Sequence, residues 1–357
     1  VLIGIAVLLV AVQPVLQRRL PTGDAGPVRG GRLAALFGGA YLTGTYGGYF
    51  AASQGVLLMG ITGLIAPLPI QRLNALKNML ATSVNMLAGD AGLFSLGHAG
   101  IAAAAGYGLA WASRQGFDLL GQLLVAGLLT LIASAIYGLI SMRTNGVFFL
   151  MVTLAAGMVC FGMAYRWSSV TGGDNGLTGI RRPELIGEYW QFYFFVLLTF
   201  VLVTLALIRV SRSPFGLALR GIRDSESRMR SLGYNVPGYK FVGVMLSGIV
   251  AGIAGVLLVW QTEFISPSFA GFEASALALV MIVLGGIGTT MGPLVGTAVV
   301  LTISQVLSTY VDRWPTILGV LFIASVILAP EGLIGGIRAL ASRVRERYRP
   351  TQLSREG

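Results

Sequence analysis

Long apolar runs separated by short polar segments are the main pattern along this chain. Several of the runs have about the length that an α-helix needs to cross a bilayer, roughly 20 residues. The pattern therefore predicts an all-α polytopic membrane protein, with roughly 8–10 transmembrane helices in one domain that spans residues 1–357. The spans predicted from residue 73 onward are Leu73–Ala88, Leu93–Ser113, Leu119–Ile140, Val147–Tyr165, Trp190–Ile208, Phe241–Trp260, Ala274–Ile287, Pro293–Tyr310 and Thr316–Leu328.

The first third of the chain has a less regular pattern. Val1–Leu16 is apolar but short for a span, which predicts that the chain begins part-way through a first helix, with no cleavable signal peptide. Arg18–Arg32 is a loop rich in Pro and Gly with a net charge of +3. Leu33–Pro69 fits either one tilted span with an interfacial piece or two short spans, so the number of spans before Leu73 stays open.

The longest polar segment after this region is Arg209–Lys240, which carries seven basic and two acidic residues, a net charge of +5. Basic loops between spans are retained on the cytoplasmic side of a membrane, so this loop is predicted to be cytoplasmic. Its interior, Pro214–Leu232, predicts one short amphipathic helix with Gly233 as its C-cap. The apolar residues of this helix are Leu217, Leu219, Ile222, Met229 and Leu232.

Counting spans from this loop assigns a side to the other connections. Arg166–Tyr189 and Gln261–Glu273 are then outside, and Gly288–Gly292 is inside. The tail Arg338–Gly357, with a net charge of +4, also falls inside, so both strongly basic segments are cytoplasmic without any adjustment. The sequence therefore predicts a multi-pass membrane protein with a cytoplasmic C-terminus.

Composition supports the membrane assignment and narrows the chemistry. The chain is 55% hydrophobic and 11% charged, against about a quarter charged in soluble domains. The net charge of +11 is distributed over loops and the C-terminus, which orients a membrane protein and does not indicate nucleic-acid binding. Cys160 is the only cysteine and His98 the only histidine, which excludes an internal disulfide and a multi-histidine metal site. There is no P-loop and no catalytic constellation, so we expect neither an enzyme nor a cofactor.

The segment SRSPFGLALRGIRDSESRMRSLGYNVPGYK resembles the cytoplasmic loop of LivM-type permeases, the membrane subunits of branched-chain amino acid ABC transporters. In that family the segment forms a coupling helix that docks into an ATPase subunit, so residues 209–240 would be a coupling-helix loop. The small residues that usually follow the Glu are replaced here by Ser227, Arg228 and Met229. The resemblance assigns ATPase coupling to Arg223, Asp224, Glu226, Leu232 and Gly233.

A second similarity lies in NMLATSVNMLAGDAGLFSLGHAG, where a Gly-rich break at Gly89–Gly92 separates two apolar runs. Polar backbone at membrane depth is tolerated only against protein or a water-filled cavity, so this break borders either the translocation pathway or a helix crossing. His98 is either part of a proton relay or a neutral ring hydrogen-bonded to a neighbouring helix, and we favour the second. The candidate residues of this segment are Asn85, Ser95, Gly97 and His98.

Two further segments resemble the same family. TGGDNGLTGI predicts a tight turn on the outer face, primarily structural, with contact to a binding protein as the alternative; its candidate residues are Thr171, Gly172, Gly173 and Asn175. ALALVMIVLGGIGTTMGPLVGTAVV predicts close helix packing and a sharp inner turn; its glycines are Gly285, Gly286, Gly288, Gly292 and Gly296.

The resemblance implies a permease subunit of an ATP-driven importer, located in a bacterial inner membrane, that forms half of a pathway for branched-chain amino acids. It also implies ATPase subunits, a second homologous permease, an extracytoplasmic substrate-binding protein and the lipid bilayer as partners. Related permeases carry urea or short amides, which are the nearest alternative substrates. An ion-coupled secondary transporter is a different possibility, but it would need charged residues inside the spans, and from Leu119 onward no span interior contains Asp, Glu or Lys.

Overall fold

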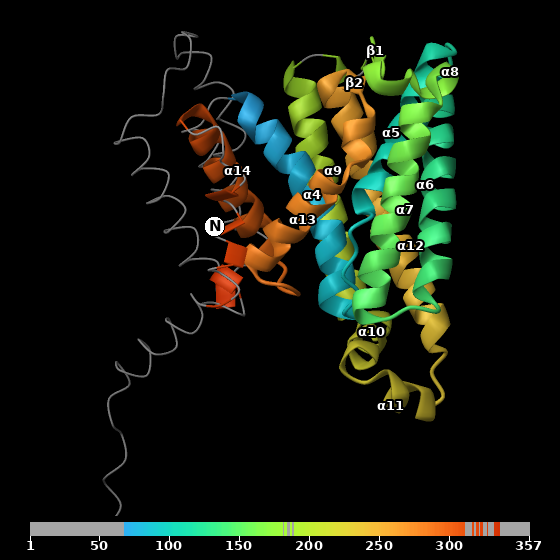
Figure 1. Ribbon diagram of the computed structural model, residues 1–357, viewed down its shortest axis with the longest axis vertical. Coiled ribbons are helices and arrows are strands. Elements are labelled where there is room, and N and C mark those ends of the chain that lie inside the picture. Colours follow the sequence, from blue (N-terminus) through green and yellow to red (C-terminus); the bar gives the residue numbers. More distant parts are fainter. Residues whose placement is uncertain are drawn as a thin grey trace, which may run out of the picture.

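A computed structural model describes residues 68–310 apart from 181, 184, 185 and 188, together with 316–317, 319–320, 322–323, 327 and 332–335. The described part is a bundle of helices with one very short strand pair, which confirms the all-α polytopic prediction (Figure 1). The spans predicted before residue 68, the basic tail 338–357 and about half of the predicted span 316–328 lie outside the described residues. The long helices are α4 (Leu68–Ala91), α5 (His98–Arg114), α6 (Leu119–Ser141), α7 (Gly146–Arg166), α9 (Tyr189–Arg212), α12 (Val236–Thr262), α13 (Phe272–Gly285) and α14 (Gly292–Tyr310).

Four of these helices are long and apolar enough to cross a membrane, by length and composition. They are α6, α7, residues Trp190–Arg212 of α9, and α12. The outward sides of α6, α7 and α9 carry many exposed large apolar residues, as expected of surfaces in contact with lipid or with another membrane subunit.

The central helix of the bundle is α12, which packs against α4, α5 and α6. Its small residues allow this close packing: a Cβ added to Gly252 would lie 2.3 Å from Thr130 of α6. A Cβ added to Gly255 would lie 2.0 Å from the carbonyl oxygen of Ala102 on α5. Because small residues let membrane helices approach closely, the glycines of α12 set the spacing of the bundle.

The two ends of the bundle differ in their connections. At one end, β1 (Leu177–Thr178) pairs antiparallel with β2 (Phe264–Ile265), so two connections predicted to share the outer side do meet. Near them lie α8 (Ser168–Thr171) and the 3-10 helices η1 (Gly173–Asn175) and η3 (Pro267–Ala270). At the opposite end stand α10 (Pro214–Asp224) and α11 (Glu226–Ser231) (Figure 1). We call this second end the basic end.

The turn that joins α13 to α14 requires its glycines. Gly286 and Gly288 have φ angles of 116° and 74°, which side chains rarely tolerate. A Cβ on Gly296 would lie 1.6 Å from the carbonyl oxygen of Met281, so α14 lies directly against α13. The predicted close packing and sharp turn are confirmed.

Several predicted boundaries were wrong. The break predicted at Gly89–Gly92 lies later, because α4 continues through Gly89 and Asp90 to Ala91, and residues 92–97 form the connection. The helix predicted from Leu93 therefore begins at His98. The span predicted from Phe241 begins earlier, because α12 starts at Val236. Asn235 caps this helix by accepting a hydrogen bond from the Gly238 amide.

Candidate coupling site at the basic end

The segment predicted as one helix from Pro214 to Leu232 forms two helices, so that prediction was wrong. Ser225 separates them, because its backbone is extended (φ −164°, ψ 100°) and its side chain accepts a hydrogen bond from the Arg228 amide as the N-cap of α11. Ser213 caps α10 in the same way, and Pro214 occupies its first turn, where its missing N–H costs nothing. Gly233, with φ 85°, ends α11 as predicted. We call α10 and α11 together the hairpin.

Some apolar side chains of the hairpin are buried against the bundle, and others are exposed. Leu219, Ile222 and Met229 are 1–9% exposed and pack toward α12 and the rest of the bundle. Leu217 and Leu232 instead are 61% and 66% exposed, among arginines. The buried leucine, isoleucine and methionine anchor the hairpin, whereas the two exposed leucines are free to contact another molecule.

Arg223 and Asp90 join the hairpin to the C-terminal end of α4. The Arg223 guanidinium donates from Nη1 to the carbonyl oxygen of Gly89 and from Nε to Asp224, over 2.5 and 3.1 Å. Asp90 is buried and accepts a hydrogen bond from Ser211 (2.9 Å), with Arg220 3.6 Å away. Arg223 therefore makes its main contact within the chain, whereas the side chain of Asp224 remains 68% exposed.

Glu226 and Lys240 join α11 to α12. Glu226 Oε2 lies 2.7 Å from Lys240 Nζ, and Oε1 lies 2.6 Å from Arg230. The Lys240 side chain is only 4% exposed and also donates to the side-chain oxygen of Asn145, just before α7. Partial burial raises the pKa of Glu226, but the hydrogen bonds and charges of Lys240 and Arg230 outweigh this effect and hold the pKa below its usual value.

Asn85 connects α4 to the turn between α13 and α14. Its amide group donates to the carbonyl oxygen of Thr289 (3.0 Å), and its oxygen accepts from the Gly288 amide (2.9 Å). Next to it, a Cβ added to Gly89 would lie 2.3 Å from Gly288 Cα. The C-terminal end of α4 therefore contacts both the hairpin and this turn, and Asn85 lies at a helix crossing.

Ser95 and Gly97 lie in the buried connection between α4 and α5, and the buried His98 is the first residue of α5. The Ser95 hydroxyl accepts from the Gly97 amide (3.2 Å), and a Cβ on Gly97 would lie 2.2 Å from the ring of Tyr137. His98 Nε2 lies 2.6 Å from the hydroxyl of Ser247 on α12. The Ser247 hydrogen is donated to the carbonyl oxygen of Ser83 (2.7 Å), so His98 Nε2 must be the donor to Ser247. The histidine thus joins α5 to α12 and α4, as the hydrogen-bonded alternative predicted.

The predicted turn at the opposite end contains the four residues Thr171, Gly172, Gly173 and Asn175. The Thr171 hydroxyl donates toward the carbonyl oxygen of Ala164 (2.6 Å) and accepts from the Gly173 amide (3.3 Å). Gly172 and Gly173 have φ angles of 75° and 61°. Asn175 is exposed, so it is the member of this set that a partner can reach.

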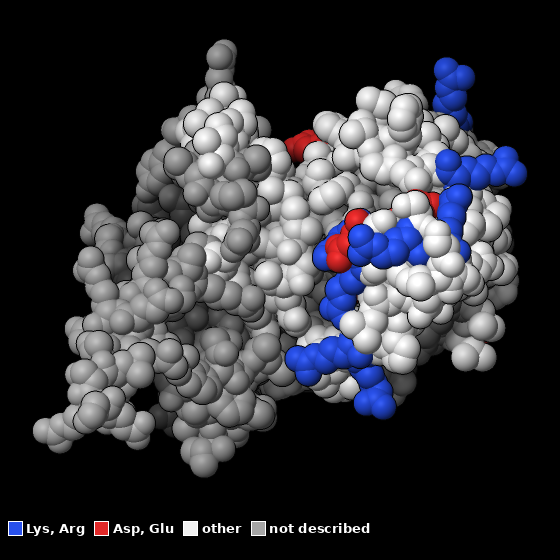
Figure 2. All heavy atoms as spheres, turned by 90° about the horizontal axis from the view of Figure 1, so that it is seen from below, with Lys and Arg blue, Asp and Glu red and all other residues white. Residues whose placement is uncertain are grey.

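Positive charge gathers on the basic end (Figure 2). Arg143, Arg212, Arg228 and Arg230 are exposed there, whereas the acidic side chains of Asp224 and Glu226 are each already paired within the hairpin region. The described surface at this end is therefore suited to a membrane face with anionic lipid and to acidic groups of a protein partner.

Two features of the structure escaped prediction from the sequence. Lys77 is one of them: it is a charged residue inside the predicted span Leu73–Ala88, and it lines a cavity described below. Its charge within an apolar span is the signal that could have marked it as a candidate. Lys240 was assigned to a polar loop but lies in α12, where its ammonium group is buried against Glu226. The polar residues around it in the sequence give no sign of this burial.

Comparison with known proteins gives a consistent result. The family model described as branched-chain amino acid transport system / permease component matches residues 70–329. The LivM permease protein of the high-affinity branched-chain amino acid transport system of Escherichia coli is 27% identical over 293 residues, covering 74% of this chain and 69% of the relative. Its counterpart from Salmonella typhimurium is 28% identical, covering 72% and 67%, and BraD of Pseudomonas aeruginosa is 28% identical, covering 46% and 52%. No solved structure matches the chain significantly.

Proposed function

Because the chain belongs to the family of permease components of branched-chain amino acid transport systems, it is a permease subunit of an ABC importer, and we propose that it carries branched-chain amino acids. We further propose that it forms half of a translocation pathway, with a second homologous permease forming the other half. Its sequence contains no P-loop, so separate ATPase subunits would supply the energy. The basic end faces the cytoplasm in this proposal, because arginines near span ends resist translocation.

The observation that carries the proposal is the construction of the hairpin. It is attached to the bundle through buried apolar side chains and through Arg223 and Glu226, yet it exposes Leu217 and Leu232 away from the bundle. A short helix with an anchored side and an exposed apolar side fits a groove on a soluble partner. We therefore assign the hairpin to ATPase docking.

The five residues with a predicted coupling role divide into two groups in this proposal. Leu232 and Asp224 are exposed and contact the ATPase directly, whereas Gly233 allows the chain to leave α11. Arg223 and Glu226 act by holding the hairpin on α4 and α12, so that a movement of the docked ATPase is passed to the membrane helices. Alternating access then follows from rocking of the two permeases against each other.

The opposite end would face the extracytoplasmic substrate-binding protein. It presents the paired strands β1 and β2 and the exposed Asn175 beside them. We propose this end as the docking surface for the binding protein, with the buried Thr171 and the two neighbouring glycines fixing the shape of the turn.

A docking test compares wild type with the double variant Leu217→Ala, Leu232→Ala in the assembled transporter, reconstituted in proteoliposomes. We expect normal membrane insertion but ATPase association weakened roughly tenfold or more, because truncation of buried leucines at an interface costs about 1.4 kcal/mol or more in total. The matched control is Leu202→Ala, which truncates a similarly exposed leucine (56%) on the apolar surface of α9. Unchanged ATPase association and turnover in the double variant would contradict docking on the hairpin.

The substrate is tested separately, by uptake of labelled L-leucine and labelled urea into the same proteoliposomes with the cognate binding protein. ATP-dependent uptake of leucine and not of urea is the expected result. Uptake of urea alone would identify the short-amide alternative. Uptake that follows an ion gradient without ATP would instead indicate a secondary transporter.

A further inference from the structure

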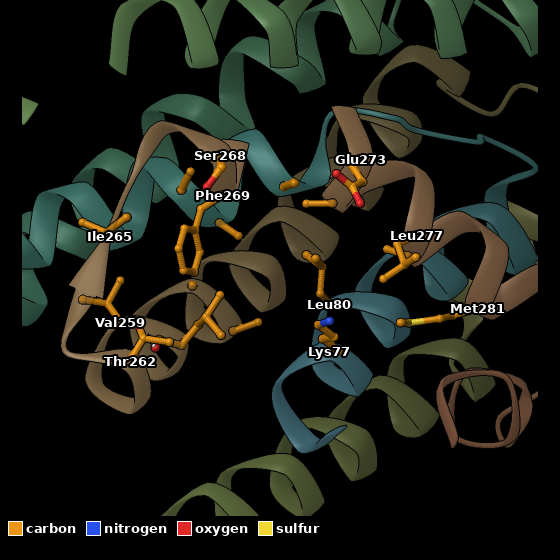
Figure 3. Close-up of a pocket in the computed structure, with 18 residues that line it drawn as sticks. Lys77, Leu80, Val259, Thr262, Ile265, Ser268, Phe269, Glu273, Leu277 and Met281 are labelled. Carbon is orange, nitrogen blue, oxygen red and sulfur yellow. Dashed lines mark hydrogen bonds between the residues drawn. The ribbon is translucent and has the colours of Figure 1, made fainter. Parts of the chain in front are cut away.

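A cavity of about 380 Å³ lies between α4, α5, α12 and α13 and is bordered by β2 and η3 (Figure 3). Its size is within the range of roughly 300–1,000 Å³ that is typical of small-molecule sites. Thr262, Ser268 and Glu273 line it and are exposed, so the cavity opens toward the end opposite the hairpin. That end is the one to which the proposed function assigns delivery of the substrate.

Small side chains create this space inside the bundle. Ala99, Ala102 and Ala103 of α5 line one wall, and Ala254 and Gly255 of α12 line another. In the view of Figure 3, Phe269, Val259 and Ile265 lie on one side of the cavity. The lining is therefore largely apolar, which favours a ligand with an aliphatic part.

Two opposite charges line the same cavity. Lys77 enters from α4 and is half-buried, whereas Glu273 enters from the first turn of α13 near the opening (Figure 3). Their charges attract each other, but no ion pair joins them among the described residues, which leaves room for a ligand between them. A charged side chain in a largely apolar cavity is costly to desolvate and is a functional candidate for that reason.

These features define the ligand by its chemistry. An anionic group would be attracted to Lys77 and a cationic group to Glu273, while an aliphatic part would lie against the alanines and Phe269. We propose that this cavity binds a small zwitterion with an aliphatic side chain, with its carboxylate at Lys77 and its ammonium group at Glu273. The proposal rests on the proposed function and adds to it that this chain recognises the amino acid directly.

Other classes of ligand would contact only some of the groups that line the cavity. Urea and short amides are neutral and would leave both charges and the apolar wall without a partner. A branched carboxylic acid would use Lys77 but not Glu273, and an alkylamine the reverse. The arrangement therefore favours the amino acid over the alternative substrates of the preceding section.

Binding can be measured on the full chain in lipid nanodiscs, without binding protein or ATPase, using labelled L-leucine. We expect unlabelled leucine to displace the label, and 4-methylpentanoate, 3-methylbutylamine and urea to compete at least tenfold more weakly. Lys77→Met and Glu273→Gln should each weaken leucine binding at least tenfold. Asp118→Asn is the matched control, because it removes another carboxylate outside the cavity while its amide oxygen can still cap α6.

Ala103→Leu provides a test that leaves both charges in place. The added carbons would occupy part of the cavity, so we expect leucine binding to weaken while the variant still elutes as a folded protein. If wild type binds leucine and the Lys77, Glu273 and Ala103 variants bind it equally well, the proposed site is wrong. Absence of displaceable leucine binding by wild type at millimolar ligand would also overturn it. In both cases the uptake assay decides the proposed function independently, since leucine uptake without such a site leaves that function standing.

Discussion

Replacement of Lys240 by Met tests whether the Glu226–Lys240 contact holds the hairpin on the bundle. The substitution keeps the apolar stem but leaves the Glu226 carboxylate without its buried partner, whose Nζ lies 2.7 Å from Oε2. Breaking a buried pair on one side costs about 3–5 kcal/mol. Glu226 keeps Arg230 and has 23% of its side chain exposed, so we expect a smaller loss, about 2–3 kcal/mol, in the free energy of local opening of α11.

Hydrogen exchange measured by mass spectrometry gives this quantity directly. A loss of about 2–3 kcal/mol corresponds to exchange about 30- to 150-fold faster. The effect should appear at the hydrogen-bonded amides of Met229, Leu232 and Tyr234 but not in α5. Arg228→Met is the matched control, because it removes one positive charge from the exposed surface of the same short helix.

A second substitution identifies the cause. In the double variant Lys240→Met, Glu226→Gln the carboxylate left without its lysine is gone, so part of the protection should return, with a coupling energy of about 1–2 kcal/mol. Equal exchange in Lys240→Met and wild type would refute the reasoning. An equal increase in Lys240→Met and Arg228→Met would also refute it, since net charge alone would then explain the change.

Two further predictions concern packing and pH. Gly89→Ala should destabilise the protein by about 1–3 kcal/mol, because the added Cβ would lie 2.3 Å from the backbone Cα of Gly288. The control Gly127→Ala in α6 has open space around the added Cβ and should stabilise the protein by about 0.5–1 kcal/mol. Melting temperatures in detergent that shift in the same direction for both variants would contradict this reasoning. The pKa of Glu226 in the folded protein lies below its ordinary value of 4.5, so the ionised carboxylate stabilises the fold. The stability advantage of wild type over Glu226→Gln should therefore be constant above about pH 4.5 and vanish as the pH falls through the lowered pKa. Thermal unfolding of both proteins across this pH range checks the sign.

The helices of the described region were predictable, because spans of apolar residues are determined by local composition. The ends of the helices were not. Asp90 reads as part of a polar break, yet it remains helical because Ser211 and Arg220 satisfy its carboxylate from a distant part of the chain. Ser225 reads as the interior of one helix, although a serine can equally cap a new one. In both cases a contact or a cap decided between local alternatives that the sequence leaves open.

The same limit applies to the site residues. The motif around Arg223 and Glu226 marks this segment as a candidate coupling site from sequence alone, but it does not reveal that these two side chains bind Gly89 and Lys240 of the same chain. Likewise, the charge of Lys77 within a predicted span signals function, whereas its proximity to Glu273 depends on the packing of α4 beside α13. Residue type identifies candidates, and only the fold assigns their partners.

The helix α4 connects the two sites proposed for this chain. Its C-terminal end accepts the hydrogen bond of Arg223 at Gly89, and Lys77, twelve residues earlier, lines the cavity. At 1.5 Å per residue the two positions are about 18 Å apart along one continuous helix. A helix with intact hydrogen bonds moves largely as a unit, so a displacement of the hairpin by a docked ATPase would reach the cavity wall through α4 itself. The cavity should therefore change its affinity for leucine when the ATPases bind nucleotide, and Arg223→Ala should reduce that change while leaving leucine affinity without ATPases intact.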